Sequence, residues 1–267
     1  MHSPSWDPQQ YRLFAPERAR PFMDLIAQVP TPDPRLVVDL GCGPGTMTAL
    51  LPERWPAARV LGVDSSTEMI NAAAALARPG RLEFELGDII TWRPTNGPVD
   101  VILSNAALQW VPGHPALLRR WVTALRPGGT LAFQVPARDS TAAGAVFRSV
   151  ATSATWAERL APVTEWHGPQ AVSPVLPVAD YVDALAALDL RVNAWETTYL
   201  HVLPGDDPVL EWFAGTGLRP YLDALHDDPE ARQAFRDEVA EALRKAFPTK
   251  EYGTVLPFRR IFVVASR

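Results

Sequence analysis

The sequence has a single cysteine, Cys42, in 267 residues, which excludes a disulfide bond within the chain. Lysine is nearly absent as well, since Lys245 and Lys250 are the only two and arginine carries the remaining positive charge. No apolar run approaches the ~20 residues that a membrane-spanning helix needs. The first residues also lack the basic flank and apolar stretch of a signal peptide. These absences predict a cytoplasmic protein without membrane contact.

Blocks of like charge are also missing, and the formal net charge is −5. A general basic surface for nucleic acid is therefore not expected. No histidine, cysteine or carboxylate cluster has the spacing of metal ligands, so no metal is predicted. Nothing in the chain indicates an obligate protein partner. The expected partner is a small molecule.

From residue 36 to residue 136, apolar strand patterns alternate with helical patterns, which favours an α/β fold with a parallel sheet. Pro52 should end or kink the first helix early, and Ser65 or Ser66 should cap the second. The predicted strands are Leu36–Leu40, Arg59–Asp64, Arg81–Leu86, Asp100–Ser104 and Thr130–Val135, and the helices are Thr46–Arg54, Ser66–Ala77 and Pro115–Leu125. The turn Arg126-Pro127-Gly128-Gly129 is expected to stop the third helix.

After Pro136 the rhythm changes. The predicted helices are Ser140–Leu160, Val178–Leu188, Asp207–Leu225 and Pro229–Phe247, the strands are Val192–Val202 and Arg260–Ala265, and Glu165–Pro177 is a loop. We expect one domain, 1–267, with an N-terminal helical cover (1–35) and a cofactor-binding core (36–136). Helical insertions (137–190 and 205–255) would form a lid over the carboxyl ends of the strands, where ligands of open α/β sheets bind.

A glycine turn follows the first predicted strand, in the run Asp39-Leu40-Gly41-Cys42-Gly43-Pro44-Gly45. Glycines let the backbone pass close to a ligand. Dinucleotide enzymes use the spacing G-x-G-x-x-G, but Thr46 stands where the third glycine would fall. The tighter spacing favours S-adenosylmethionine, which carries a carboxylate and no phosphate. Cys42 is expected to be a small buried filler.

Acidic or amide side chains follow the next strands. Asp64 is placed to accept both ribose hydroxyls of the cofactor, and Asp88 the adenine amino group, with the Ile89 N–H meeting a ring nitrogen. Asp39 would bind the methionine ammonium, and Asn105 would supply a carbonyl near the same end. Each has a structural alternative, such as a strand-end acid or a helix cap. The conjunction of the glycine turn with these residues favours the site.

These segments resemble the class I S-adenosylmethionine-dependent methyltransferases, and more narrowly the trans-aconitate 2-methyltransferases. The narrow resemblance rests on Trp6-Asp7-Pro8 with Tyr11, Asn105-Ala106-Ala107-Leu108-Gln109-Trp110 and Thr216-Gly217-Leu218-Arg219-Pro220. It implies a three-layer Rossmann-like methyltransferase fold, with a seven-stranded, mostly parallel sheet, an antiparallel last strand and helical lid insertions. It also implies methyl transfer to a carboxylate of trans-aconitate, giving the monomethyl ester and S-adenosylhomocysteine.

A carboxylate acceptor is ionised at neutral pH and is itself the nucleophile, so no general base and no catalytic side chain are predicted. Because the net charge is −5, a polycarboxylate would need a local arginine pocket. Arg219 is the first candidate, with a helix-end ion pair as its alternative. Arg20 and one of Arg259 and Arg260 follow; these two point to opposite faces of a strand. Aromatic candidates are Trp110 and Tyr199 on the substrate side, Trp195 as an alternative there, and Tyr11 over the cofactor.

Other functions stay open at this point. A methyltransferase of the same fold could act on another small acid or on a hydroxyl, which would need His114 or His201 as a base. A cofactor-binding module without activity is a further class. A nucleotide-dependent oxidoreductase is disfavoured by Thr46.

Overall fold

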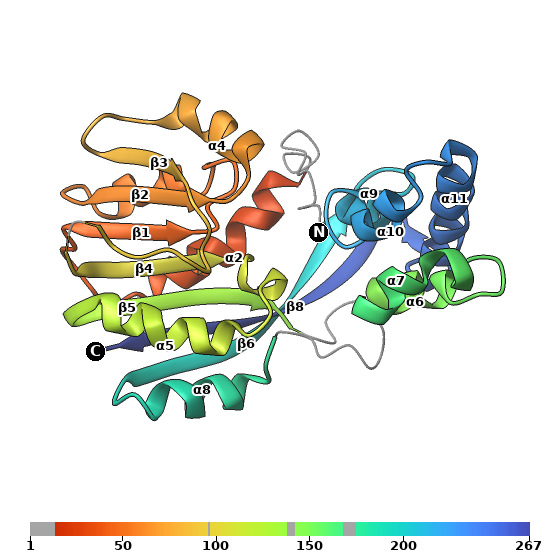
Figure 1. The fold of residues 1–267 in the computed structure, drawn as a ribbon. Helices are drawn as coiled ribbons and strands as arrows, with labels where there is room; N and C mark the ends of the chain where they lie inside the picture. The colour runs from red at the N-terminus through yellow and green to blue at the C-terminus, as the bar shows by residue number, and fades with distance from the viewer. Residues whose placement is uncertain (1–13, 96, 138–141, 168–174) are drawn as a thin grey trace. The chain divides into compact units, whose positions relative to one another are not determined.

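The computed structural model describes residues 14–95, 97–137, 142–167 and 175–267 (Figure 1). The chain forms two compact units. Among the described residues, the sheet unit holds 15–95, 97–137, 175–197 and 260–267, and the helical unit holds Phe14, 142–167 and 198–259. Two long strands, β6 and β8, continue from one unit into the other along the chain.

The sheet has the strand order β3-β2-β1-β4-β5-β8-β6, and the short β7 pairs with β8. The bounds are β1 Leu36–Leu40, β2 Arg59–Asp64, β3 Leu82–Leu86, β4 Val99–Asn105, β5 Leu125–Pro136, β6 Arg191–Leu203, β7 Thr249–Lys250 and β8 Gly253–Ser266. The pairs β1–β2, β2–β3, β1–β4 and β4–β5 are parallel, and β5–β8 is antiparallel. The predicted α/β fold with an antiparallel last strand is confirmed, with β7 as an unpredicted eighth strand.

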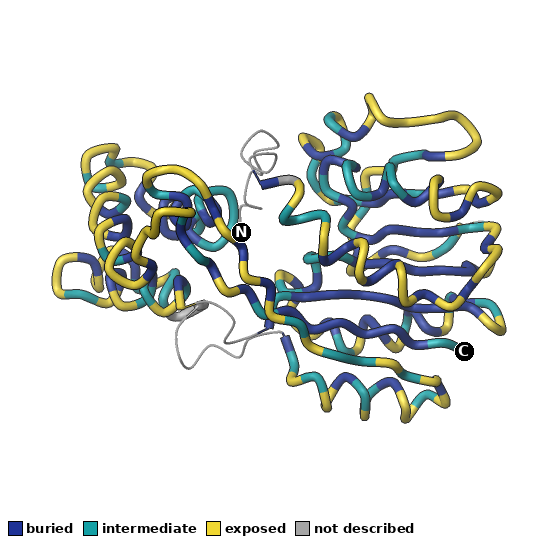
Figure 2. Tube along the Cα trace, turned by 180° about the vertical axis from the view of Figure 1, so that it is seen from behind, coloured by how far each residue is buried: buried dark blue, intermediate teal, exposed yellow. Residues whose placement is uncertain are grey.

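The two central strands, β1 and β4, are almost completely buried. All residues of β4 except Asn105 are buried, as are four of the five residues of β1, and Figure 2 shows these strands in dark blue. Continuous apolar runs of this kind are typical of parallel strands that are covered on both faces. The helices α2 (Ala15–Ala27) and α5 (His114–Ala124) both pack on β5, and α8 (Val178–Ala186) packs on α5.

One buried acid fixes the start of β4. Asp100 accepts hydrogen bonds from the backbone N–H groups of Arg35, at 3.1 Å, and Leu36, at 2.8 Å. It also forms an ion pair with Arg126. Because Asp100 is fully enclosed, these donors offset the cost of burying its charge. Asp100 is therefore a structural residue that ties β1 to β4 and β5.

The helices near the glycine turn are shorter than predicted. The segment after the turn is a 3₁₀ turn, Thr48–Leu50, followed by α3, Leu51–Arg54. Of the two predicted effects of Pro52, ending or kinking the helix, the first was wrong: Pro52 lies in the first turn of α3, where the missing N–H costs nothing. The next helix, α4, spans Thr67–Ala73 and is capped by Ser66, as predicted.

Two predicted long helices are each divided. The expected helix Ser140–Leu160 is α6, Ala142–Ala151, and α7, Ala157–His167. The expected helix Asp207–Leu225 is α9, Pro208–Ala214, and α10, Arg219–Ala224. Small and polar residues at 152–155, and the glycines at 215 and 217, supply the breaks.

The outer strands are longer than predicted. β5 begins at Leu125, so the expected turn at Arg126–Gly129 belongs to this strand, with a register shift opposite β4 between Val99 and Val101. β8 begins at Gly253 rather than at Arg260, because its first residues pair with β7.

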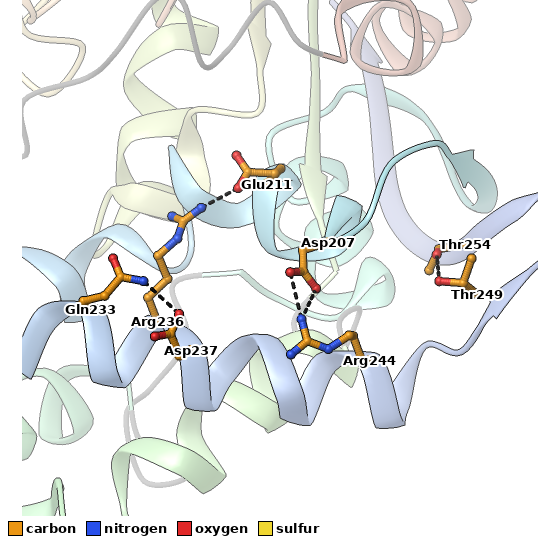
Figure 3. Close-up of polar contacts among 8 residues, drawn as sticks. All are labelled: Asp207, Glu211, Gln233, Arg236, Asp237, Arg244, Thr249 and Thr254. Atoms are coloured by element: carbon orange, nitrogen blue, oxygen red, sulfur yellow. Dashed lines mark hydrogen bonds and ion pairs between the residues drawn. The ribbon is translucent and has the colours of Figure 1, made fainter.

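In the helical unit, α11 (Pro229–Ala246) is linked to α9 and its N-cap by ion pairs (Figure 3). The Arg244 Nη1 donates to both Asp207 oxygens, at 2.7 and 2.8 Å, and Arg236 pairs with Glu211. The core of the same unit contains aromatic pairs, with Phe147 against Phe213 and Trp156 against Phe235. The predicted insertion 137–190 is split between the units, since α8 belongs to the sheet unit. That the helical unit forms a lid stays a prediction.

Within the described ranges, every helix is too short or too polar to cross a bilayer. The same residues contain no group of three or more His, Cys, Asp or Glu side chains arranged to hold a metal ion.

Candidate functional site

The glycine turn after β1 is strapped to the end of β2. The N–H groups of Gly41 and Cys42 both donate to the Val63 carbonyl, at 2.8 and 3.0 Å. Gly41 has φ +82°, and a Cβ placed on it would lie 2.4 Å from the Ala107 Cβ. Only glycine fits here, because the loop after β4 lies directly against the turn.

Gly43 differs from its neighbours in the turn. Its φ is +54°, and among the described residues no atom beyond its own chain neighbours lies within 4 Å of the position where a Cβ would stand. A Cβ on Gly45 would instead meet the Phe84 ring at 2.7 Å, so that glycine serves packing. The position over Gly43 is thus open, whereas the positions over Gly41 and Gly45 are occupied by neighbouring side chains.

Asp64 connects the turn to the start of α4. Its Oδ2 accepts from the Gly43 N–H and its Oδ1 from the Ser66 N–H, both at 2.9 Å. A carboxylate has about four acceptor positions, so two remain for ligand hydroxyl groups. The predicted contact with a ribose is compatible with this arrangement.

Asp39 is 2% exposed and lies near the end of β1, just before the turn. Its Oδ2 accepts from the Thr48 hydroxyl at 2.6 Å, and its Oδ1 has no partner among the residues that the structure describes. Burial raises the Asp39 pKa to about 6; the Thr48 hydrogen bond opposes this rise and the Asp64 charge adds to it. An unpartnered buried carboxylate oxygen fits a cationic ligand group, such as the ammonium of the predicted cofactor.

The raised pKa of Asp39 makes the stability of the free protein pH-dependent. Because its pKa rises from 3.8 to about 6 on folding, its contribution is complete below about pH 4 and is lost as pH rises through about 6. Relative to Asp39→Asn, the wild type should lose about 2–3 kcal/mol of unfolding free energy across this range. Urea unfolding of both proteins between pH 4 and pH 7 measures this difference, and parallel pH curves would contradict it.

Asp88 is exposed and caps the turn that follows β3. Its Oδ1 accepts from the Ile90 N–H at 2.7 Å, and its carbonyl accepts from Trp92 at 2.8 Å. The Ile89 N–H donates to no acceptor in the described part of the chain. The capping alternative is therefore realised for one oxygen of Asp88, while the other oxygen and the Ile89 N–H stay candidates for the adenine.

The loop after β4 is held by two glutamines. Gln134 donates through Nε2 to the Asn105 Oδ1 at 2.7 Å, and its main-chain carbonyl accepts from the Ala106 N–H at 3.0 Å. Gln109 donates to the Ala106 carbonyl at 2.6 Å. Ala106 has φ +52°, which is costly for a residue with a side chain. Sequence reasoning missed the role of Gln134; the signal was one polar residue inside the apolar run of a strand.

Of the adjacent arginines, Arg260 is the buried one, at 6% exposure, and Arg259 is half-buried. Arg260 donates through Nη1 to the Gln134 Oε1 at 3.2 Å. The sheet unit thus brings together Arg260, Asn105, the glycine turn and the strand-end acids.

The other predicted substrate residues have different surroundings. Arg20 is exposed within α2, and Trp110 is 38% exposed, so Trp110 is not a core residue. Arg219 lies in the helical unit with its Nε 3.4 Å from the Asp223 Oδ2, which matches the ion-pair alternative. Tyr199 is buried in the same unit and stacks on His201 at 5.9 Å between ring centroids. Tyr11 lies outside the described residues.

His114 is not placed to act as a base. Its Nδ1 lies 3.2 Å from the Val111 carbonyl and its Nε2 lies 2.7 Å from the Tyr181 hydroxyl. Burial lowers its pKa, and the ring is enclosed. His201 is also buried, stacked on Trp212 at 4.8 Å between ring centroids. Both rings serve packing, which disfavours chemistry that needs a histidine base.

Solved structures share the fold at low sequence identity. A mycolic acid cyclopropane synthase, solved with S-adenosylhomocysteine, aligns with a TM-score of 0.56 at 13% identity, covering 100% of this chain and 90% of its own. Phosphoethanolamine N-methyltransferase 2 of Haemonchus contortus aligns with a TM-score of 0.56 at 14% identity, covering 93% of this chain and 52% of its own. These likenesses establish the Rossmann-like methyltransferase fold.

Sequence relatives are much more similar. The methyltransferase-domain family matches residues 37–129. The trans-aconitate 2-methyltransferase of Streptomyces avermitilis is 51% identical over 270 residues, covering 99% of this chain and 97% of the relative. That of Streptomyces coelicolor is 48% identical over 271 residues, covering 99% and 88%. This chain belongs to the trans-aconitate 2-methyltransferase family.

Proposed function

We propose that this protein transfers a methyl group from S-adenosylmethionine to one carboxylate of trans-aconitate, giving the monomethyl ester and S-adenosylhomocysteine. The observation that carries the proposal is the 51% identity over nearly the full length of a trans-aconitate 2-methyltransferase. The open space at Gly43, the Asp64 carboxylate and the unpartnered Asp39 oxygen support the methyl donor.

The residues of the sheet unit fit this donor. Asp64 accepts the ribose hydroxyls with its two remaining acceptor positions, and Asp39 accepts the ammonium with its free oxygen. Asp88 and the Ile89 N–H bind the adenine edge; the expectation from the sequence that Tyr11 contacts the cofactor stays a prediction. When bound, the cofactor supplies an electrophilic methyl group on a sulfonium ion. The main-chain groups of Gly41, Gly43 and Gly45 shape the turn against which it lies, and Asn105 borders the same turn.

The acceptor needs no base. A carboxyl group is ionised at neutral pH, which agrees with the enclosed positions of both candidate histidines. Catalysis is then mainly the alignment of the attacking oxygen, together with exclusion of water. Arg219 binds a carboxylate that does not react, and Arg20, Trp110 and Tyr199 are the further candidates for the substrate side. A firm grip on the attacking carboxylate would stabilise the ground state and slow the reaction.

A methyl-transfer assay tests the proposal. S-adenosylhomocysteine release is measured with trans-aconitate, cis-aconitate, isocitrate and citrate, and the product is identified by mass. We expect trans-aconitate to have the highest kcat/KM and to gain one methyl group. No turnover with any of these acids, although S-adenosylhomocysteine binds, would contradict it and favour another small acid or a hydroxyl acceptor.

The remaining sequence-based expectations stay predictions. They are a cytoplasmic location and the absence of nucleic acid, membrane and obligate protein partners.

A further inference from the structure

A chain of hydrogen bonds crosses three neighbouring strands of the sheet unit. On β8, the Arg260 Nη1 donates to the Gln134 Oε1 at 3.2 Å. On β5, the Gln134 Nε2 donates to the Asn105 Oδ1 at 2.7 Å, at the end of β4. Arg260 is 6% and Gln134 1% exposed, so both are withdrawn from solvent. The chain leads from a buried cation to a half-buried amide next to the glycine turn.

The donor and acceptor roles in this series of hydrogen bonds can be assigned in only one way. A guanidinium has only donors, so Gln134 must turn its oxygen toward Arg260. The Gln134 Nε2 group then faces Asn105, and the Asn105 Oδ1 accepts its hydrogen bond. The amide oxygen and nitrogen of Asn or Gln are assigned from such networks, and here the arginine removes the ambiguity. The Asn105 Nδ2 group is consequently left as a donor, with no protein partner among the described residues.

The backbone around Asn105 is fixed as well. Ala106 is held in its left-handed conformation by the Gln134 carbonyl on its N–H and by the Gln109 amide on its carbonyl. Ala107 packs against Gly41. The residue that carries the free donor therefore has little freedom to turn, which is the preorganisation that a binding group needs.

We propose that Arg260 and Gln134 are positioning residues that hold Asn105 with its Nδ2 group outward, and that this donor binds a carboxylate of a ligand. The inference rests on the proposed function, in which the methyl donor and the acceptor both carry carboxylates. It differs from the sequence-based expectations that Arg260 contacts the substrate and that Asn105 supplies a carbonyl. Those expectations would leave the orientation of Gln134 without consequence.

Gln134→Glu reverses the polarity with almost no change in shape. The introduced carboxylate accepts from Arg260 but cannot donate, so Asn105 must turn its nitrogen inward and its oxygen outward. Arg260→Lys is the comparison variant at the other positioning residue, because an ammonium also only donates and so keeps the original orientation of Gln134. Asn105→Asp keeps an oxygen for Gln134 and removes the outward donor, so it tests the proposal even if Gln134→Glu does not fold.

The measurements are calorimetric binding of S-adenosylhomocysteine and of 5′-methylthioadenosine, which lacks the amino-acid carboxylate, and KM and kcat with trans-aconitate. If the donor binds the cofactor carboxylate, Gln134→Glu and Asn105→Asp bind S-adenosylhomocysteine about tenfold or more weakly and methylthioadenosine unchanged. If it binds the substrate, both nucleosides bind normally and KM rises about tenfold or more at similar kcat. Arg260→Lys should impair binding or KM less than Gln134→Glu does in either case, because a donor-only side chain keeps the orientation of Gln134.

Three results would overturn the proposal. One is Asn105→Asp with all ligand constants unchanged. Another is equal weakening of both nucleosides by Asn105→Asp, which means general damage to the site. The third is Arg260→Lys failing as badly as Gln134→Glu while its unfolding free energy is unchanged. Failure of the proposed function itself would appear separately, as a wild-type protein that binds S-adenosylhomocysteine but forms no ester from trans-aconitate.

Discussion

Replacing Asp64 with alanine is expected to weaken S-adenosylmethionine binding about 10³-fold. Two ribose hydroxyls would lose the carboxylate that accepts their hydrogen bonds, and bonds to a charged group contribute about 1.5–3 kcal/mol each. The substitution would also leave the N–H groups of Gly43 and Ser66 without the carboxylate oxygens to which they now donate at 2.9 Å. Calorimetric titration with S-adenosylhomocysteine measures the change, together with the unfolding free energy of the free variant.

Because Asp64 also stabilises the turn, a control must separate stability from binding. Ser66→Ala removes the cap of α4, whose hydroxyl accepts from the Met69 N–H at 3.2 Å, and should cost about 1 kcal/mol of stability. It should leave cofactor affinity nearly unchanged. Asp64→Asn keeps an acceptor but replaces the other oxygen with a donor, so its cofactor affinity should lie between those of Asp64→Ala and Ser66→Ala. Normal binding by Asp64→Ala, or an equal loss in Ser66→Ala, would remove Asp64 from the ribose site.

The central fold could be predicted from the sequence because burial there dictates local pattern. The bounds of β1 and β2 match the predicted strands residue for residue, since each is an apolar run that ends at a turn. The helical unit was harder. The break between α6 and α7 contains neither proline nor glycine, so the sequence pattern predicted one helix through residues 152–156. The extension of β8 depends on its pairing with β7, which is a tertiary property that no window of sequence contains.

The same limit applies to the site. The glycine turn and Asp64 are local in sequence and follow from spacing, and the structure joins them through the Gly43 N–H. The bond from Gln134 to Asn105 joins residues 29 positions apart, and the bond from Arg260 to Gln134 joins residues 126 apart. The sequence shows only that a glutamine interrupts an apolar strand. Its partners are set by strand order, so its role appears only when β8 is placed beside β5.

Arg219→Ala is expected to lower kcat/KM for trans-aconitate about 10²-fold, almost entirely through KM. Removing one partner of a desolvated charge pair costs about 2–5 kcal/mol. A carboxylate that does not react is held equally in the ground state and the transition state, so the loss appears in binding and not in kcat. Affinity for S-adenosylhomocysteine should be unchanged. Arg219→Lys keeps the charge but loses the bidentate geometry, so its KM should lie between those of wild type and Arg219→Ala.

The matched control for Arg219 is its neighbour on α10. The Arg219 Nε lies 3.4 Å from the Asp223 carboxylate, and 46% of the Asp223 side chain is exposed, so this pair alone contributes little stability. If Arg219 binds substrate, Asp223→Asn should keep KM within about threefold of wild type, because an exposed helix pair of this kind is worth only about 0.3–0.5 kcal/mol. If the ion pair is the whole role of Arg219, Asp223→Asn should reproduce the effect of Arg219→Ala. That second pattern, or an unchanged KM in Arg219→Ala, would assign Arg219 to the end of α10 and leave Arg20 as the next candidate for the substrate carboxylate.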